Sequence, residues 1–390
     1  MHFSKLVDRV AGKGAEAWRV HHAALQQRAS GRNVILLTVG DPDQSPPPSV
    51  IAATIKALQE HRTGYAPIAG FPDVRAAIAA RFQRFTGRPC DADNVVVVPG
   101  AQAGLYCAMQ CLAGTGDEVI VGEPSYATYE AVVGASGALM VTVPLAPERG
   151  FHPDVDQIAQ SITPRTRVIW INSPHNPTGA VLGQEEIERI AALCREHNIW
   201  LLSDEVYETL GYTGAHISPW SVPHMSDRTV VVSSLSKSYA IPGYRFGWVI
   251  APNDLVKHLL KLVLCIFYGA SPFVQAGALE ALTHDLPEAS AMRNIYSRRA
   301  KLLADILATA PGCKISRPEG GMFLMLDVRD TGICSEDFAL ELLEREGVAV
   351  LPCDGFGPSA YGHLRISLTA PDAVLGDAGS RIVRFAGSLN

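Results

Sequence analysis

Lys237 stands shortly after a run of valines that would end in a polar turn. Residues 230–232 are all valine, which predicts a buried strand. A lysine held partly out of water loses some of its preference for the charged form, so its amine becomes available to form a Schiff base with an aldehyde. The hydroxyls of Ser234 and Ser236 and the cation of Arg245 indicate a phosphate nearby. On its own, however, a lysine after a strand is usually a solvated loop residue.

A glycine turn offers further groups that would suit a phosphate. Four valines at 95–98 lead through Gly100 into a predicted helix that begins near Ala101 and Gln102. The free N–H groups and the positive dipole end at the start of a helix favour an anion. Most strand-to-helix turns contain glycine for geometric reasons alone, so this turn indicates an anion site only in combination with the serines and the arginine around Lys237.

Asp204 closes the apolar run at 199–203, which predicts another buried strand. An unpaired carboxylate in such a place is costly, so a cation or a hydrogen-bond donor must match it. From this residue alone, a helix cap or a structural ion pair explains the carboxylate as well as a ligand does.

The order and spacing of these residues resemble those in the class I/II family of pyridoxal-phosphate aminotransferases. The resemblance rests on Asn176-Pro-Thr-Gly179, on Asp204-Glu-Val-Tyr207, and on Ser234-x-x-Lys237 with Arg245 after it. It spans nearly the whole chain, and it departs from the family in the glycine turn, where Ala101-Gln102 replaces a Ser/Thr-rich version. Backbone groups and the glutamine side chain would then contact the phosphate.

The resemblance implies roles around pyridoxal 5'-phosphate as the cofactor. Lys237 would be the catalytic residue that holds the cofactor, and Asp204 would pair with the pyridine nitrogen. Asn176 and Tyr207 would contact the phenolic oxygen, and Tyr126 would stack on the ring. From the sequence alone, Tyr126 fits core packing at a helix start almost as well, and it could be confused with Tyr129.

The resemblance also implies contacts to the phosphate and to the substrate. The residues expected around the phosphate are Gly100, Ala101, Gln102, Ser234, Ser236 and Arg245. Tyr65 would reach the phosphate of the neighbouring subunit, so a homodimer with composite active sites is expected. Arg365 would grip the substrate carboxylate with two parallel hydrogen bonds, and Gly40 and Asn176 would add further substrate contacts. Arg365 alternates with apolar residues, a pattern that more often belongs to an arginine on an exposed strand face. His175 is expected to support the site without touching the substrate.

The elements that must position these residues form an alternating series. Valine- and isoleucine-rich runs separated by amphipathic stretches predict strands at 95–98, 119–121, 140–143, 168–171, 200–202 and 230–232. A further strand at 246–251 follows a short loop and is expected to be antiparallel. The predicted fold class is therefore α/β, with a mostly parallel sheet covered on both faces.

The chain ends predict a second, smaller α+β unit. Residues 287–310 should form a long charged helix, followed by strands at 323–326, 348–351 and 363–368 and a helix at 336–346. Near the start, a helix is expected at 18–28 and a strand at 34–39. The family resemblance (pyridoxal-phosphate transferase fold type I) implies a large cofactor-binding domain at 46–288 and a small domain assembled from 1–45 and 289–390.

Composition narrows the class of partner. The 390 residues carry a net charge of -6 without a basic cluster, which argues against nucleic acid and an anionic membrane as partners. Residues 1–14 lack the apolar core of a secretory signal, no run has transmembrane length, and no residues are expected to bind a metal.

Eight cysteines without a Cys-x-x-Cys pair fit free thiols in the cytoplasm. The glycine pattern Gly12-Lys-Gly-Ala-Glu-Ala17 fits a dinucleotide fingerprint, but no strand precedes it, which excludes that interpretation.

The expected activity is transfer of an amino group from an L-amino acid to a 2-oxo acid, such as pyruvate or 2-oxoglutarate, by a ping-pong mechanism. The segments 162–167, 264–269, 318–323 and 355–360 are similar to bacterial arginine:pyruvate transaminases, which suggests arginine as the donor. Aspartate- or aromatic-type substrates and a C–S β-lyase on the same fold stay open as alternatives. A cofactor-sensing regulator is disfavoured because no basic helix-turn-helix precedes Gly40.

Overall fold

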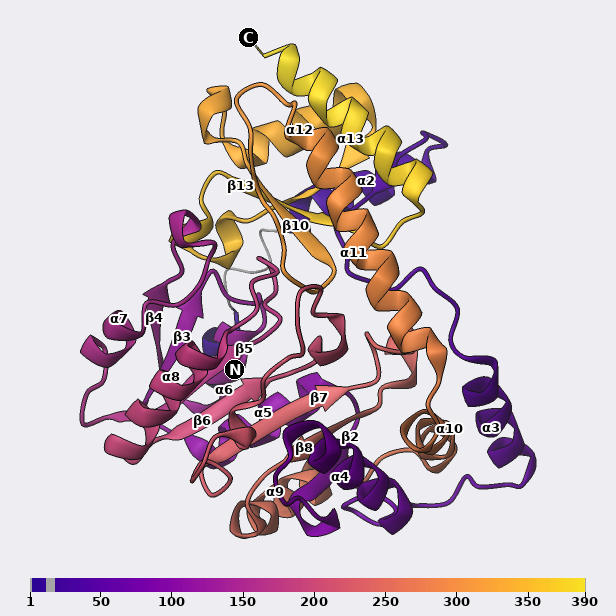
Figure 1. Ribbon diagram of the computed structural model, residues 1–390, viewed down its shortest axis with the longest axis vertical. Coiled ribbons are helices and arrows are strands. Elements are labelled where there is room, and N and C mark those ends of the chain that lie inside the picture. Colours follow the sequence, from indigo (N-terminus) through magenta and orange to yellow (C-terminus); the bar gives the residue numbers. More distant parts are fainter. Residues whose placement is uncertain (1, 12–17, 390) are drawn as a thin grey trace.

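The computed structural model describes residues 2–11 and 18–389, and the glycine pattern at 12–17 lies outside the described residues. Its centre is a seven-stranded sheet, drawn in the lower half of Figure 1, with the order β2-β8-β7-β6-β5-β3-β4. The strands are β2 (Val95–Val98), β3 (Glu118–Glu123), β4 (Leu139–Pro144), β5 (Thr166–Asn172), β6 (Trp200–Asp204), β7 (Thr229–Ser234) and β8 (Gly247–Ile250). Only β8 runs antiparallel to its neighbours, β2 and β7. The predicted strands and the antiparallel direction of β8 are confirmed.

Helices cover both faces of this sheet, because the central strands are apolar on both sides. On one face Val96 and Val98 pack with α5 (Ala101–Leu112), α6 (Tyr129–Ser136) and α9 (Asn253–Ile266). On the other face the alternate valines pack with α4 (Pro72–Thr86) and α10 (Pro272–Thr283). Farther along the same face lie α7 (Val155–Gln160) and α8 (Gln184–Glu196). The α/β class with a doubly covered sheet is confirmed.

The C-terminal part forms a second group of layers, at the top of Figure 1. An antiparallel sheet has the order β12-β13-β10-β9, and a parallel pair joins β1 to β11. The strands are β1 (Ile35–Leu36), β9 (Lys314–Ser316), β10 (Phe323–Asp327), β11 (Val348–Ala349), β12 (Leu351–Pro352) and β13 (His363–Ser367). The helices are α2 (Arg19–Ala29), α11 (Pro287–Leu307), α12 (Ser335–Glu346) and α13 (Asp372–Gly387). One core contains residues from both chain ends, such as Val20, Leu37 and Ile382.

Two predicted strands differ from the structure, and both differences occur where the chain leaves one sheet for another. The strand expected at 34–39 is limited to Ile35–Leu36, because Leu37 bonds to β11 through its N–H and to Ser367 of β13 through its C=O. The strand expected at 348–351 is divided, because Leu351 pairs with Arg365 of β13 instead of β1. Local sequence patterns do not record such a change of partner.

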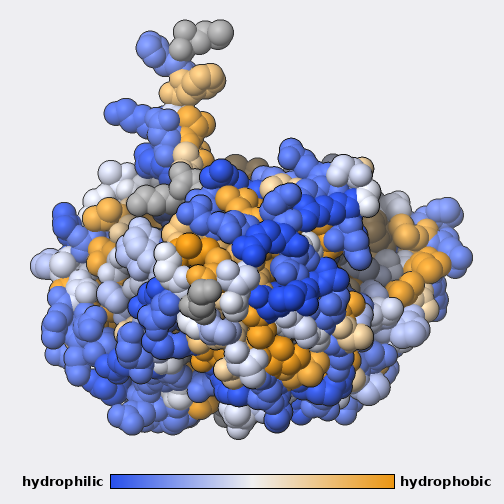
Figure 2. All heavy atoms as spheres, turned by 90° about the horizontal axis from the view of Figure 1, so that it is seen from above, coloured by the Kyte–Doolittle hydropathy of each residue, from blue (hydrophilic) through white to orange (hydrophobic). Residues whose placement is uncertain are grey.

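Two further helices lie in the N-terminal part, α1 (Leu6–Arg9) and α3 (Pro48–Gln59). Helix α3 packs on α10, and α1 packs on α6. Seen from above, hydrophilic residues dominate the surface and hydrophobic residues form small groups between them (Figure 2). Within the part of the chain that is described, every helix is too short or too polar to cross a membrane.

Candidate active site

A cavity of about 180 Å³ lies where β6 and β7 end and α5 begins. Ligands of α/β proteins commonly bind at the carboxyl ends of parallel strands. Ten of the residues predicted from the sequence line this cavity: Ala101, Gln102, Tyr126, Asn176, Asp204, Tyr207, Ser234, Ser236, Lys237 and Arg245. Of the other predicted residues, Gly40, Gly100 and Arg365 contact this group, and Tyr65 does not.

Lys237 is held by the N-terminal part of the chain. Its Nζ donates a hydrogen bond of 2.7 Å to the carbonyl oxygen of Gly40. The pKa of the amine is lowered to about 8, chiefly by burial; Asp41 opposes this shift, and Arg365 and Arg245 add to it. The amine is therefore uncharged in a substantial fraction of molecules near pH 8, as a nucleophilic lysine requires.

Asp204 is buried at the end of β6 and has two donors. The hydroxyl of Tyr129 donates to Oδ2 at 2.7 Å, and the N–H of Val206 donates to Oδ1 at 3.2 Å. Burial raises the pKa of the carboxyl to about 6, although both hydrogen bonds favour the charged form. A cationic group brought into the cavity would stabilise this carboxylate further.

Tyr129 is a site residue that the sequence argument did not select. It is 2% exposed, and its ring stacks on Trp170 with 3.9 Å between centroids. Tyr126, which was selected, lies at the cavity wall with its ring edge-on to Tyr129. Tyr129 begins α6 and Tyr126 lies three residues before it, so only packing decides which hydroxyl reaches Asp204.

Asn172 is a second missed residue, and it joins two strand ends. Its Nδ2 donates to the backbone oxygen of Asp204 at 2.9 Å, and its Oδ1 accepts from the N–H of Asn176 at 2.9 Å. The hydroxyl of Tyr207 bonds Asn176, while burial raises the pKa of that tyrosine. An asparagine at the end of a strand was the only signal that could have identified Asn172.

Arg365 is 3% exposed, although its alternation pattern is more typical of an exposed strand face. Its Nη1 donates to Oδ1 of Asn176 at 3.0 Å, and its Nη2 donates to the carbonyl oxygen of Thr38 at 2.7 Å. The guanidinium carbon lies 4.1 Å from the ring centroid of Phe323 and 5.2 Å from that of Phe356. Its Nε has no hydrogen-bond partner among the described residues. A buried guanidinium with a spare donor is prepared to bind an anion.

The turn before α5 is closed tightly by neighbouring backbone and by Arg245. Gly100 has φ 85°, and a Cβ there would collide with the guanidinium of Arg245. A Cβ on Gly247 would lie 2.7 Å from the backbone nitrogen of Ala101. Glycine at both positions therefore lets β8 and Arg245 approach the start of the helix, where N–H groups favour an anion.

Two residues stand apart from the cavity lining. Tyr65 is 86% exposed, and its ring packs on Tyr268 with 4.9 Å between centroids. His175 is buried, bonds Thr178 through Nδ1, and has its pKa lowered to about 4 by burial. A neutral, buried histidine of this kind supports the loop before Asn176 without facing the cavity.

Comparison with known proteins agrees with this geometry. The family described as aminotransferase class I and II matches residues 32–382. The arginine–pyruvate transaminase AruH of Pseudomonas aeruginosa is 47% identical over 389 residues, which are 100% of this chain and 99% of that protein. The aspartate/prephenate aminotransferase of Thermus thermophilus is 36% identical over 373 residues, 94% of this chain and 95% of that protein.

Solved structures of aminotransferases are similar to this chain over nearly its whole length. The aspartate aminotransferase of Thermus thermophilus with maleate has a TM-score of 0.93 at 35% identity, covering 99% of this chain and 100% of that chain. A double mutant of the Thermus aspartate aminotransferase has a TM-score of 0.94 at 34% identity. With this fold and a match over most of its length, the chain belongs to the class I and II aminotransferases, enzymes that move an amino group from an amino acid to a 2-oxo acid.

Proposed function

We propose that the 180 Å³ cavity binds pyridoxal 5'-phosphate and uses it to move the amino group of arginine to pyruvate. The observation that carries the proposal is that three different chemical groups line one cavity. They are the amine of Lys237, the carboxylate of Asp204, and the anion-favouring turn at Gly100 with Arg245. An aldehyde, a basic ring nitrogen and a phosphate are the groups that these residues complement, so the site fits the cofactor.

Each residue has a task in this proposal. Lys237 would hold the cofactor through its aldehyde, and the free amine of Lys237 would accept and return the proton at the substrate Cα. Asp204 keeps a proton on the ring nitrogen, and Tyr129 keeps Asp204 charged and oriented. Asn176 and Tyr207 donate to the phenolic oxygen. When bound, pyridoxal phosphate supplies an electron sink for the bond that breaks at Cα.

The phosphate is assigned to the start of α5 and to the side chains around it. The N–H groups at Ala101 and Gln102, the hydroxyls of Ser234 and Ser236, and Arg245 would hold it. Gln102 is tied in place, because its Oε1 accepts a hydrogen bond of 3.0 Å from the hydroxyl of Thr128.

The substrate carboxylate is assigned to Arg365, with Gly40 and Asn176 as its neighbours. Burial of this guanidinium strengthens its attraction for a carboxylate. Arginine and pyruvate are proposed as the substrate pair because of the 47% identical arginine–pyruvate transaminase. Aspartate or aromatic donors and 2-oxoglutarate are the alternatives, in view of the aspartate/prephenate relative.

Several organisational proposals accompany this function. The division into a large domain at 46–288 and a small domain at 1–45 and 289–390 is supported by the core that joins Val20 and Leu37 to Ile382. A homodimer is supported by the exposed rings of Tyr65 and Tyr268, which would contact the phosphate site of the partner subunit. The eight cysteines are free, which fits the reducing cytoplasm.

The test is a visible absorption scan of the purified protein with pyridoxal phosphate and L-arginine, L-aspartate or L-phenylalanine, each followed by pyruvate. The expected result is a band that bleaches with arginine and returns with pyruvate, and parallel double-reciprocal plots in steady-state kinetics. The Lys237→Ala variant is the control, in which no turnover is expected. A missing band after addition of pyridoxal phosphate would contradict the cofactor assignment, and bleaching by another donor alone would contradict arginine.

A further inference from the structure

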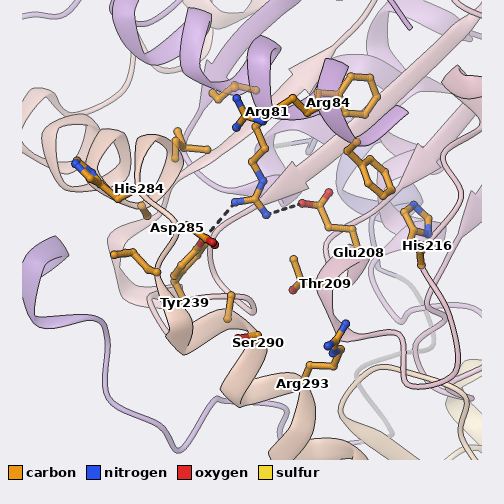
Figure 3. Close-up of a pocket in the computed structure, with 18 of the residues that line it drawn as sticks. Arg81, Arg84, Glu208, Thr209, His216, Tyr239, His284, Asp285, Ser290 and Arg293 are labelled. Carbon is orange, nitrogen blue, oxygen red and sulfur yellow. Dashed lines mark hydrogen bonds and ion pairs between the residues drawn. The ribbon is translucent and has the colours of Figure 1, made fainter. Parts of the chain in front are cut away.

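A second and larger cavity, of about 730 Å³, lies between α4, the segment at 208–216 and the junction of α10 with α11. It has no lining residue in common with the candidate active site. Its volume is within the range of small-molecule sites, and it exceeds what a single inorganic ion needs. Figure 3 shows its charged side chains arranged around a central space.

One wall of this cavity is a fixed ion pair. Nη2 of Arg81 lies 3.2 Å from Oε1 of Glu208, and Nη1 of Arg81 donates to the hydroxyl of Tyr239 at 3.4 Å, as the dashed lines of Figure 3 mark. Both side chains of the ion pair are largely buried. The apolar residues Phe82 and Trp248 complete this side. The ion pair makes this wall nearly neutral.

The rest of the lining includes two exposed arginines that no group of the described chain pairs. Arg84 on α4 and Arg293 on α11 have neither an ion pair nor a side-chain hydrogen bond within the described residues. Asp285 is the one lining acid in the same condition among those residues. The hydroxyl of Thr209, which Figure 3 places between Glu208 and Arg293, has no partner in the described chain either. Exposed arginines that no acid of the described chain pairs, beside apolar walls, suit an organic anion.

We propose that this cavity is a second ligand site, which binds a small organic molecule carrying a carboxylate or phosphate group through Arg84 and Arg293. Apolar walls would hold the carbon skeleton, and the two guanidiniums, which Figure 3 labels at opposite sides of the cavity, would each attract an anionic group. Arginine serves this purpose well, since its planar fork matches both kinds of oxyanion.

The site is coupled to the candidate active site through the protein between them. Glu208 directly follows Tyr207, and its Oε2 accepts a hydrogen bond of 3.3 Å from Ser233, the neighbour of Ser234. An anion that attracts Arg81 competes with Glu208 for that guanidinium. The occupant therefore alters the setting of two residues assigned to the cofactor, and by linkage cofactor binding alters the affinity of the second site equally.

The experiment measures binding to the cofactor-loaded enzyme by isothermal titration calorimetry. Succinate is the carboxylate probe and inorganic pyrophosphate is the phosphate probe. Because succinate also suits Arg365, each titration is repeated with the Arg365→Ala variant. Binding of either probe that survives Arg365→Ala is expected, and it identifies a site outside the catalytic cavity.

The variants Arg293→Gln and Arg84→Gln/Arg293→Gln assign that binding to the second cavity. Arg293→Gln is expected to weaken it by about tenfold, the effect of losing a charge-assisted hydrogen bond, and the double variant by about a hundredfold. The matched control is Arg28→Gln, an exposed arginine on α2 outside both cavities, which should bind as the wild type does. Circular dichroism verifies that the variants fold. If the double variant does not fold, the Arg293→Gln variant alone tests the assignment.

The coupling has its own readout. The apparent Kd for pyridoxal phosphate is measured on the apo-enzyme with and without the probe. Because the probe also competes at the phosphate site in both proteins, the coupling is the part of the change that is present in the wild type and missing in the Arg293→Gln variant. Binding lost with Arg365→Ala but retained in both cavity variants would overturn the proposal, as would the failure of both probes to bind.

Discussion

Asp204 illustrates how the properties of one side chain come from its nearest neighbours. Burial disfavours the charged carboxylate and raises its pKa to about 6, while Tyr129 and Val206 donate hydrogen bonds that favour the charge. The opposing effects leave a carboxylate that gains most from a cationic partner. Burial shifts the pKa of Lys237 in the opposite direction, because it disfavours the charged amine and so lowers the pKa.

Tyr129→Phe removes the shorter of the two hydrogen bonds to the Asp204 carboxylate. The pKa of Asp204 should rise further, and the affinity for pyridoxal phosphate should fall by about tenfold to a hundredfold, because a hydrogen bond to a charged group contributes about 1.5–3 kcal/mol. A spectroscopic titration of the apo-enzyme at pH 7.5 measures this. Tyr361→Phe, an exposed tyrosine outside the cavity, is the control. Equal affinity in both variants would show that Tyr129 does not support Asp204.

The lowered pKa of Lys237 predicts its reactivity in the apo-enzyme. The rate of labelling by an amine-directed reagent should rise through a midpoint near pH 8, because the neutral amine is the reactive form. Mass spectrometry of the digest follows this rate, and Lys301 on α11 corrects for changes in the reagent. A midpoint near 10.5, the ordinary pKa of a lysine, would mean that burial does not affect this amine.

At the scale of elements, β8 and the start of α5 depend on each other. Strand β8 runs antiparallel between β2 and β7, which brings Gly247 against the turn at Gly100. A side chain on Gly247 would meet backbone atoms, which cannot rotate away as a flexible side chain can. The packing of two elements thus fixes the position of the N–H groups assigned to the phosphate.

Gly247→Ala is therefore expected to destabilise the protein by about 1–3 kcal/mol, the usual cost of overpacking, and to weaken cofactor binding. The added Cβ would lie 2.7 Å from the nitrogen of Ala101 and 2.8 Å from the oxygen of Ser233. Chemical denaturation and cofactor titration measure the two effects. Gly243→Ala is the control, because nothing lies within 4 Å of a Cβ at that position. Equal stability of the two variants would refute this account.

At the scale of the whole molecule, the candidate site depends on both ends of the chain. Gly40 accepts a hydrogen bond from Lys237, and Thr38 accepts one from Arg365 on β13. Arg365 in turn donates to Asn176 after β5. These contacts connect residues 189 to 327 positions apart, so the site forms only when both groups of layers are folded.

The proposed composite dimer predicts complementation between two defective variants. Lys237→Ala and Tyr65→Ala should each be impaired, but a hybrid dimer would have one site with both residues intact. Random reassortment makes about half of the dimers hybrids, so the mixture should recover roughly a quarter of wild-type activity. Activity after mixing under exchange conditions is the measurement.

The control mixture combines Lys237→Ala with Asp204→Asn. Both of these residues line the cavity of one chain, so no hybrid site is intact and no activity should return. Demonstrated subunit exchange without recovery in the Tyr65→Ala mixture would argue against a role of Tyr65 in the partner's site.

The sequence by itself determined the family, the strands of the central sheet and the antiparallel direction of β8. These features are recorded locally, because runs such as the valines at 95–98 predict a buried strand wherever they lie. Motif order and spacing identified most of the residues that line the candidate cavity. A shared active-site chemistry keeps such residues at fixed positions after strand ends, where local sequence shows them.

Only the tertiary structure decided which groups touch. Tyr126 and Tyr129 are equivalent in a local pattern, and packing on Trp170 selects Tyr129 as the donor to Asp204. The alternation around Arg365 does not reveal that both faces of its strand are covered, since the covering residues are distant in the sequence. The burial of a side chain, its pKa and the presence of the second cavity all depend on neighbours that are distant in the sequence. No local pattern therefore predicts them.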